Sequence, residues 1–154
     1  MKSRTIVLTV ASVLIAVTVC LAQSPQMGTW KLNEAKSKFA PGAPKNTTVV
    51  YEAAGDSIKV TTDGVDVTGA ATHSEWTGKF DGADYPVTGD ANADTRAYKQ
   101  VNDHTLELTN KKAGKVVLTG KIVVSADGKS RTLTTNSTDS KGMKMKNMAV
   151  YDKQ

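Results

Sequence analysis

The clearest structural signal in the chain is the stretch GKVVLTGKIVVSADGKSRTLTTNSTD, which runs from Gly114 to Asp139. Two runs rich in Val, Leu and Thr flank Asp127-Gly128, a dipeptide typical of tight turns because both residues tolerate positive φ. Side chains on a strand alternate between its two faces. The first run thereby places one set of residues on a common face: Val116, Leu118, Gly120, Ile122 and Val124. The stretch predicts a β-hairpin with one buried face.

The same pattern extends over most of the chain from Thr47 onward. Turn dipeptides recur between short apolar runs: Gly55-Asp56, Asp63-Gly64 and Asp81-Gly82. They divide the chain into about ten candidate strands. These are residues 28–33, 47–53, 57–62, 70–80, 84–88, 94–101, 104–110, 115–125, 130–138 and 145–152. Helix is expected only in residues 33–39, where Asn33 is a candidate N-cap and Pro41 and Pro44 follow closely.

One-sided alternation over consecutive strands with short connections indicates an antiparallel meander. Ten strands in one flat sheet would twist or split. We therefore expect an all-β fold, an antiparallel up-and-down barrel of about 8–10 strands, with a β-sandwich as the alternative.

The N-terminus has the features of an export signal. Lys2 and Arg4 precede the apolar run from Ile6 to Val19, and small residues then predict cleavage before Gln23. The predicted organisation is a signal peptide over residues 1–22 and a single barrel domain over residues 23–154. Cys20 raises acylation as an alternative, although the residues before it do not match the usual lipoprotein signal. The expected localisation is periplasmic or secreted.

Removal of residues 1–22 leaves a chain without cysteine, and the loss of Lys2 and Arg4 lowers the net charge from +5 to +3. A mildly basic exported domain without a long basic stripe is a poor candidate for binding nucleic acid. The densest basic group is KGMKMK, with Lys141, Lys144 and Lys146. This group is typical of a solvated turn and strand, and contact with an anionic surface is the alternative.

The alternation also predicts which large side chains point inward. They either fill the barrel or line a cavity that holds a ligand, since small barrels do both. Aromatic residues make up only 5% of the chain, so the sequence is compatible with a partly empty interior as well as a filled one. The candidate lumen residues are Tyr51, Trp76, Tyr98, Leu106, Leu108, Leu118, Ile122, Leu133, Met145 and Tyr151.

The opening GTWKL from Gly28, the length of about 130 residues, the ten strands and the closing AVYDKQ together resemble the calycins. These include lipocalins, fatty-acid-binding proteins and small bacterial lipocalin-like secreted domains. The resemblance implies a barrel with an apolar ligand cavity. Trp30 would then pack across its closed end, with Gly28 and Trp30 in structural roles. Two features of fatty-acid-binding proteins are missing. In those proteins an arginine that binds the ligand carboxylate lies two residues before the tyrosine of the last strand. Here that tyrosine is Tyr151, and the arginine position is occupied by Ala149. Residues 33–46 are too short for the two lid helices.

Metal and calcium sites have weaker support. His73 and Glu75 share a strand face but need a third ligand such as His104. Asp90, Asn92 and Asp94 have the spacing of a calcium loop, but the residues that should supply its turn glycine and bidentate glutamate do not match. We expect no metal and no cofactor.

Catalytic signatures are lacking in the sequence, which has no nucleophile elbow, zinc-protease motif or phosphate loop. The predicted function is therefore that of an exported, monomeric, non-catalytic barrel that binds a small hydrophobic or amphipathic ligand. The alternative is a structural or protein-interaction module of the cell envelope that presents a sheet face or edge strand. A catalytic barrel, with His73 or His104 facing the lumen, is the third option.

Overall fold

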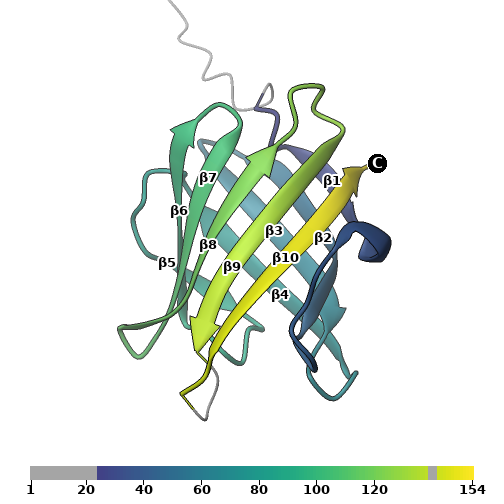
Figure 1. Ribbon diagram of the computed structural model, residues 1–154. Helices are drawn as coiled ribbons and strands as arrows, with labels where there is room; N and C mark the ends of the chain where they lie inside the picture. The colour runs from purple at the N-terminus through teal and green to yellow at the C-terminus, as the bar shows by residue number, and fades with distance from the viewer. Residues whose placement is uncertain (1–23, 139–141) are drawn as a thin grey trace, which may run out of the picture.

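A computed structural model describes residues 24–138 and 142–154, which form a ten-stranded β-barrel (Figure 1). The predicted signal peptide and Cys20 lie outside the described residues. The strands are β1 (Gly28–Leu32), β2 (Lys45–Ala54), β3 (Ser57–Val65), β4 (Ala71–Gly78), β5 (Tyr85–Thr88), β6 (Thr95–Asn102), β7 (Thr105–Lys112), β8 (Lys115–Val124), β9 (Ser130–Thr138) and β10 (Lys144–Lys153). Every candidate strand corresponds to one of them.

The barrel is closed, and every neighbouring pair of strands is antiparallel. The ring follows chain order, and β1 pairs with β10 to complete it, with Trp30 opposite Lys153. This arrangement confirms the predicted all-β, antiparallel up-and-down barrel and excludes the sandwich alternative. Closure pairs the strand edges of the described barrel. An unpaired edge could hydrogen-bond to a strand of another chain, so closure removes this route of association.

A single short turn of 3-10 helix, η2 (Glu34–Lys36), is the helix that the structure describes. Asn33 caps it as expected, because its side chain accepts a hydrogen bond from the Lys36 backbone N–H at 3.2 Å. In the described part of the chain no helix is both long and apolar enough to cross a membrane. The connection between β1 and β2 thus carries no pair of lid helices over the barrel.

The turn expected at Asp63-Gly64 is a wrong prediction, because both residues lie inside β3. A Cβ on Gly64 would lie 2.2 Å from the carbonyl oxygen of Lys45 on β2. Glycine is needed there for the close approach of two strands beside a register irregularity, and not for a turn. The chain reverses a few residues later, where Asp66 accepts a backbone hydrogen bond from Thr68 at 2.7 Å.

The face predicted for β8 also needs one correction. Asn110 pairs with Leu118 but Lys111 pairs with Val116, so Val117 is an extra residue in the ladder. This bulge shifts the alternation, and Val116 is 55% exposed instead of facing the interior. From Leu118 to Val124 the predicted alternation holds.

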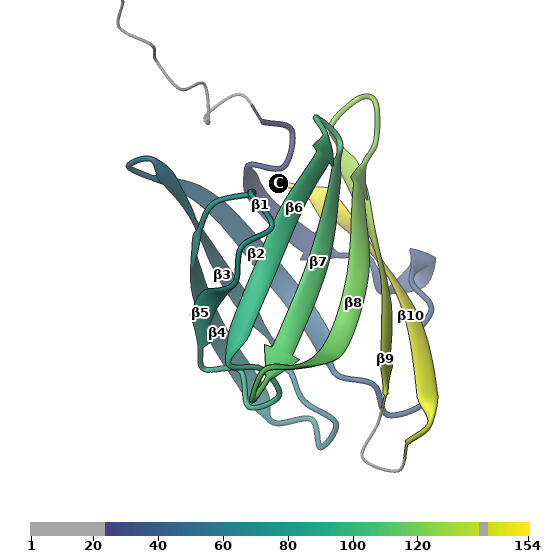
Figure 2. The ribbon, with the colours of Figure 1, turned by 90° about the vertical axis from the view of Figure 1, so that its left-hand side faces the viewer.

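The strands give the barrel two different ends (Figures 1 and 2). One end carries the β2–β3, β6–β7 and β8–β9 turns and the C-terminus; we call it the closed end. The other carries the β1–β2 connection, the β3–β4 and β7–β8 turns and the start of β10; we call it the mouth. The core cluster includes Trp30, Tyr51, Trp76, Tyr98 and Tyr151.

Candidate functional site

Trp30 packs inside the closed end. Its side chain is 0% exposed, and its indole N–H donates a hydrogen bond to the Gln26 carbonyl oxygen at 2.8 Å. The Lys153 ammonium lies 5.1 Å from the centre of the Trp30 ring. Neighbouring Gly28 has a φ of 102°, a conformation that favours glycine and that starts β1. Trp30 is therefore buried in the interior, and its role in closing this end of the barrel stays a prediction.

Arg131, on β9, lies deep inside the closed end and was missed in the sequence analysis. Its guanidinium carbon lies 4.9 Å from the ring centres of Trp30, Tyr51 and Tyr151 alike. The side chain is 3% exposed, and its Nε and Nη1 atoms have no hydrogen-bond partner. The aromatic rings supply cation–π attraction in place of a counter-ion. The signal for it was its position two residues before Leu133, on the same strand face.

Arg131 can be compared with the carboxylate-binding arginine of fatty-acid-binding proteins, whose position in this chain is occupied by Ala149. Ala149 is buried and pairs with Leu133, so β10 supplies no arginine at that level. The arginine buried at the closed end comes from the neighbouring strand, where Arg131 pairs in register with Tyr151. It packs among the rings at the closed end and does not line the cavity at the mouth.

An aromatic cluster occupies the middle of the barrel. The Trp76 and Tyr98 ring centres lie 4.8 Å apart at an angle of 78°, and Tyr51 and Tyr98 lie 6.2 Å apart. The Trp76 indole N–H donates to the Arg96 carbonyl oxygen at 2.8 Å. Burial raises the pKa of Tyr98 well above its usual value. Burial likewise raises the pKa of Tyr151 to about 12, with Arg131 opposing the shift. Both phenols are therefore neutral hydrogen-bonding groups at ordinary pH.

Nine of the ten candidate lumen residues belong to the core cluster or pack against it, and the tenth, Met145, lines the cavity at the mouth. Leu133 packs half-buried against the core, and Leu118 and Met145 lie farther out, toward the mouth. The others are buried in the packed interior: Tyr51, Trp76, Tyr98, Leu106, Leu108, Ile122 and Tyr151. The interior is thus filled toward the closed end and hollow toward the mouth. Contact of any of these residues with a ligand stays a prediction.

A cavity of about 540 Å³ opens at the mouth. Leu118, Met145 and Val117 contribute apolar wall from β8 and β10, and Val67 contributes from the β3–β4 turn. The remaining lining residues are Pro44, Asp90, Asn92, Asn110, Ser137 and Thr138. Of the predicted lumen set, only Leu118 and Met145 reach this cavity. Turn and bulge residues supply much of its wall, and strand alternation does not predict them.

Arg96 fixes the polar side of the mouth. Its guanidinium donates from Nε to the Asn110 side-chain oxygen at 2.9 Å and from Nη2 to Asp90 at 3.0 Å. Arg96 is 7% exposed. Because Asp90 is held in this buried ion pair, its carboxylate is fixed beside the cavity. A smaller hollow of about 150 Å³ adjoins this network, with Thr62, Ser74 and Arg96 among its lining residues.

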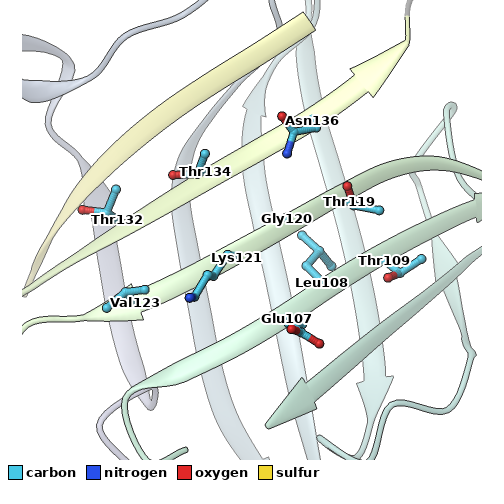
Figure 3. Close-up of a pocket in the computed structure, with 10 residues that line it drawn as sticks. All are labelled: Glu107, Leu108, Thr109, Thr119, Gly120, Lys121, Val123, Thr132, Thr134 and Asn136. Carbon is cyan, nitrogen blue, oxygen red and sulfur yellow. The ribbon is translucent and has the colours of Figure 1, made fainter. Parts of the chain in front are cut away.

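A second groove, of about 560 Å³, lies on the outer wall over β7, β8 and β9. Figure 3 shows its threonine side chains on the three strands, with Lys121 and Glu107 among them. Leu108 and Gly120 line it from beneath. The sequence analysis assigned Leu108 to the lumen and did not anticipate a groove on this outer face.

The residues considered for metal binding do not form a cluster. His73 and Glu75 lie on the outer wall, where Asp63 contacts His73 Nδ1 at 2.6 Å and Lys59 pairs with Glu75 at 2.7 Å. The hydrogen bond to Asp63 raises the pKa of His73. His104 instead lies in the β6–β7 turn, with its Nδ1 atom 3.2 Å from the Val124 carbonyl oxygen. Within the described ranges, no group of three or more His, Cys, Asp and Glu side chains could hold a metal ion.

The candidate calcium loop is occupied by other contacts. The Asp90 carboxylate accepts from the Asn92 backbone N–H at 2.9 Å and from Arg96. Asp94 accepts from the Lys112 ammonium at 2.7 Å and from the Ala113 backbone N–H at 2.8 Å. The spacing is therefore explained by a turn and a strand connection.

No protein-family model and no curated protein matches the chain. Solved structures that resemble it include a redesigned β-barrel, mFAP1, bound to DFHBI, with 16% identity and a TM-score of 0.47. That match covers 84% of this chain and 98% of the other. EF1p2_mFAP2b bound to DFHBI matches with 10% identity and a TM-score of 0.47, covering 84% of this chain and 94% of the other. A likeness at this level says nothing about what this chain binds.

Proposed function

We propose that the protein is an exported, non-catalytic barrel that binds a small hydrophobic or amphipathic ligand in the mouth of its lumen. The observation that carries this proposal is the cavity of about 540 Å³ beside Leu118 and Met145. Ligand sites in proteins are typically concave, largely apolar and about 300–1,000 Å³ in volume, with a few placed polar groups. The mouth cavity has this size and this mixture.

The driving force would be burial of apolar surface. A ligand that loses about 150 Å² of apolar surface to the cavity gains about 4 kcal/mol at about 25 cal/mol per Å². Asn110, Asn92 and the hydroxyls of Ser137 and Thr138 lie in the same wall and would orient a polar group of the ligand. This combination of apolar and polar lining residues favours an amphipathic ligand over a purely apolar one.

A binding role without chemistry is supported by the state of the ionisable group in the wall. The Asp90 carboxylate is held in an ion pair with the buried Arg96 at 3.0 Å, so it is already engaged by the protein and is not free to act on a ligand. The two histidines considered for catalysis lie outside the cavity lining.

Export is supported by the sequence alone, through the basic start, the apolar run and the small residues before Gln23. Intact-mass analysis of the protein from fractionated cells tests this part. A chain that begins at Gln23 in the periplasmic or secreted fraction supports the proposal. A chain that keeps residues 1–22 in the cytoplasm contradicts it.

Ligand binding is tested with residues 23–154, which contain all ten strands. Native mass spectrometry of protein from its source looks for a co-purifying small molecule, and anilinonaphthalene sulfonate serves as a fluorescent probe of the cavity. We expect Leu118→Trp to fill the mouth and abolish probe binding, whereas Val123→Trp, on the outer wall, should leave it unchanged.

Both variants must keep the wild-type circular dichroism spectrum for the comparison to hold. Absence of both a co-purifying mass and probe binding in the wild-type protein rejects the lumen-binding proposal. Equal probe binding by wild type and Leu118→Trp rejects the mouth as the site.

A further inference from the structure

Exposed apolar side chains gather at the rim of the mouth. Val67 in the β3–β4 turn is 68% exposed, Val116 at the start of β8 is 55% exposed, and Met143 just before β10 is 60% exposed. Val67 lines the mouth cavity together with Val117 and Met145, so the turn and the two strands border one opening. Single exposed apolar residues are ordinary, but here three come from separate connections at the same end.

The same rim carries lysines that pair with no acidic side chain in the described part of the chain. Lys144 and Lys146 line a surface groove of about 440 Å³ together with Val116. Lys115 precedes Val116 and is likewise exposed. None of these three lysines forms an ion pair with a residue that the structure describes. Of the basic motif noted in the sequence, Lys144 and Lys146 therefore belong to the mouth, and Lys141 lies outside the described residues.

The acidic groups described at this end already contact other residues of the protein. Asp84 and Asp94 pair with Lys111 and Lys112 at 2.6 and 2.7 Å. Asp66 accepts hydrogen bonds from the backbone and side chain of Thr68 within its own turn. Among the described residues, the charges at the rim that no ion pair balances are three lysines against the single carboxylate of Asp66, so the rim is positive on balance beside its protruding apolar side chains.

We propose that the mouth of the barrel docks on the surface of an anionic lipid bilayer. Val67, Val116 and Met143 would enter the boundary between headgroups and acyl chains, while Lys115, Lys144 and Lys146 contact anionic headgroups. Exposed apolar tips surrounded by basic residues bind such surfaces through both apolar burial and charge. Docking in this orientation places the cavity against the bilayer and does not require that the cavity hold a ligand.

Flotation with vesicles tests the docking directly. Residues 23–154 are mixed with ligand-free vesicles of phosphatidylcholine containing about a third phosphatidylglycerol, and with vesicles of phosphatidylcholine alone. We expect binding to the anionic vesicles that weakens as ionic strength rises. Replacing Lys115, Lys144 and Lys146 together with Gln should weaken partitioning by about fivefold per lysine, close to a hundredfold in all.

Matched controls separate the rim from the overall charge. Replacing Lys31, Lys99 and Lys121 with Gln removes the same charge from the outer wall and should cost far less. Val67→Ser with Val116→Ser should reduce binding, while Val101→Ser with Val123→Ser, at exposed valines outside the rim, should not. No flotation with anionic vesicles, or equal losses for rim and wall variants, overturns the proposal, as does capture of a protein partner by the rim without any vesicle binding. Because the vesicles carry no probe, this result is independent of the lumen-binding test.

Discussion

Replacement of Trp30 with Ala removes the largest side chain from the closed end. The indole is fully buried, donates to the Gln26 carbonyl oxygen and lies beneath the Arg131 guanidinium. Truncation leaves a cavity, an unpaired carbonyl oxygen and a buried cation that has lost one of its three rings. These consequences arise at one place, so their free energies overlap and cannot simply be added.

The expected loss of unfolding free energy is about 5 kcal/mol. Truncation of a buried Trp or Phe to Ala costs about 3–5 kcal/mol, and the upper end applies where neighbours cannot collapse into the space. A desolvated cation–π contact contributes about 2 kcal/mol. Domains of this size have total stabilities of about 5–15 kcal/mol, so the variant should be close to unfolding.

Urea denaturation followed by circular dichroism measures the change, with the fluorescence of Trp76 as a second probe. Trp30→Phe is the matched variant, because it keeps a ring beneath Arg131 and loses the indole N–H; it should cost about 1–3 kcal/mol. Val123→Ala on the outer wall should cost less than about 0.5 kcal/mol. A loss below about 1 kcal/mol for Trp30→Ala refutes the argument that this residue closes the barrel.

Three further outcomes follow from the interior. Arg131→Met should change the unfolding free energy by less than about 2 kcal/mol in either direction. The variant loses the cation–π contacts, but it also removes the desolvation cost of a buried, unpaired charge, and the two terms offset each other. Urea titration measures the change, and a loss above about 4 kcal/mol contradicts this balance. Gly64→Ala should destabilise the barrel by about 2 kcal/mol or more through its clash with β2, and an unchanged melting temperature would count against it. Tyr98 and Tyr151 have folded pKa values above their unfolded value near 10, so stability should hold below pH 10 and fall above it as the unfolded phenols ionise first. Absorbance titration should show Tyr98 and Tyr151 ionising well above pH 10, later than the tyrosines of the urea-unfolded chain, and complete ionisation of all tyrosines of the folded protein near pH 10 would contradict the burial.

The strands were predictable because each carries its own signal. Alternation from Leu118 to Val124 and the turn at Asp127-Gly128 are local patterns, and the number of strands left a barrel or a sandwich as the two possible outcomes. The turn prediction at Asp63-Gly64 was wrong because the same dipeptide suits both a turn and a close approach of two strands. Only the position of the partner strand distinguishes these two cases. The prediction that Val116 faces the interior was wrong because of a bulge in β8, and that bulge depends on the register with β7.

The candidate site was predictable only in part. Alternation identified inward residues, but it could not tell which end of the barrel is packed and which is hollow. That difference depends on how Trp30, Arg131 and the tyrosines fill the same cross-section, which no short window of sequence contains. Val67 and Pro44 reach the cavity from connections, and their positions depend on where the turns fold in space.

The first described residues and the C-terminus both lie at the closed end. The Gln154 backbone N–H donates to the Thr29 carbonyl oxygen at 3.0 Å, and the Lys153 ammonium contacts the Pro25 carbonyl oxygen at 3.4 Å. A fluorescent protein, affinity tag or surface linker fused after Gln154 would therefore stand at the opposite end from the mouth (Figure 1). Immobilised in this way, the barrel would present its opening to the solution, and the turns around that opening could be diversified as a library while the tryptophan-packed end holds the scaffold together.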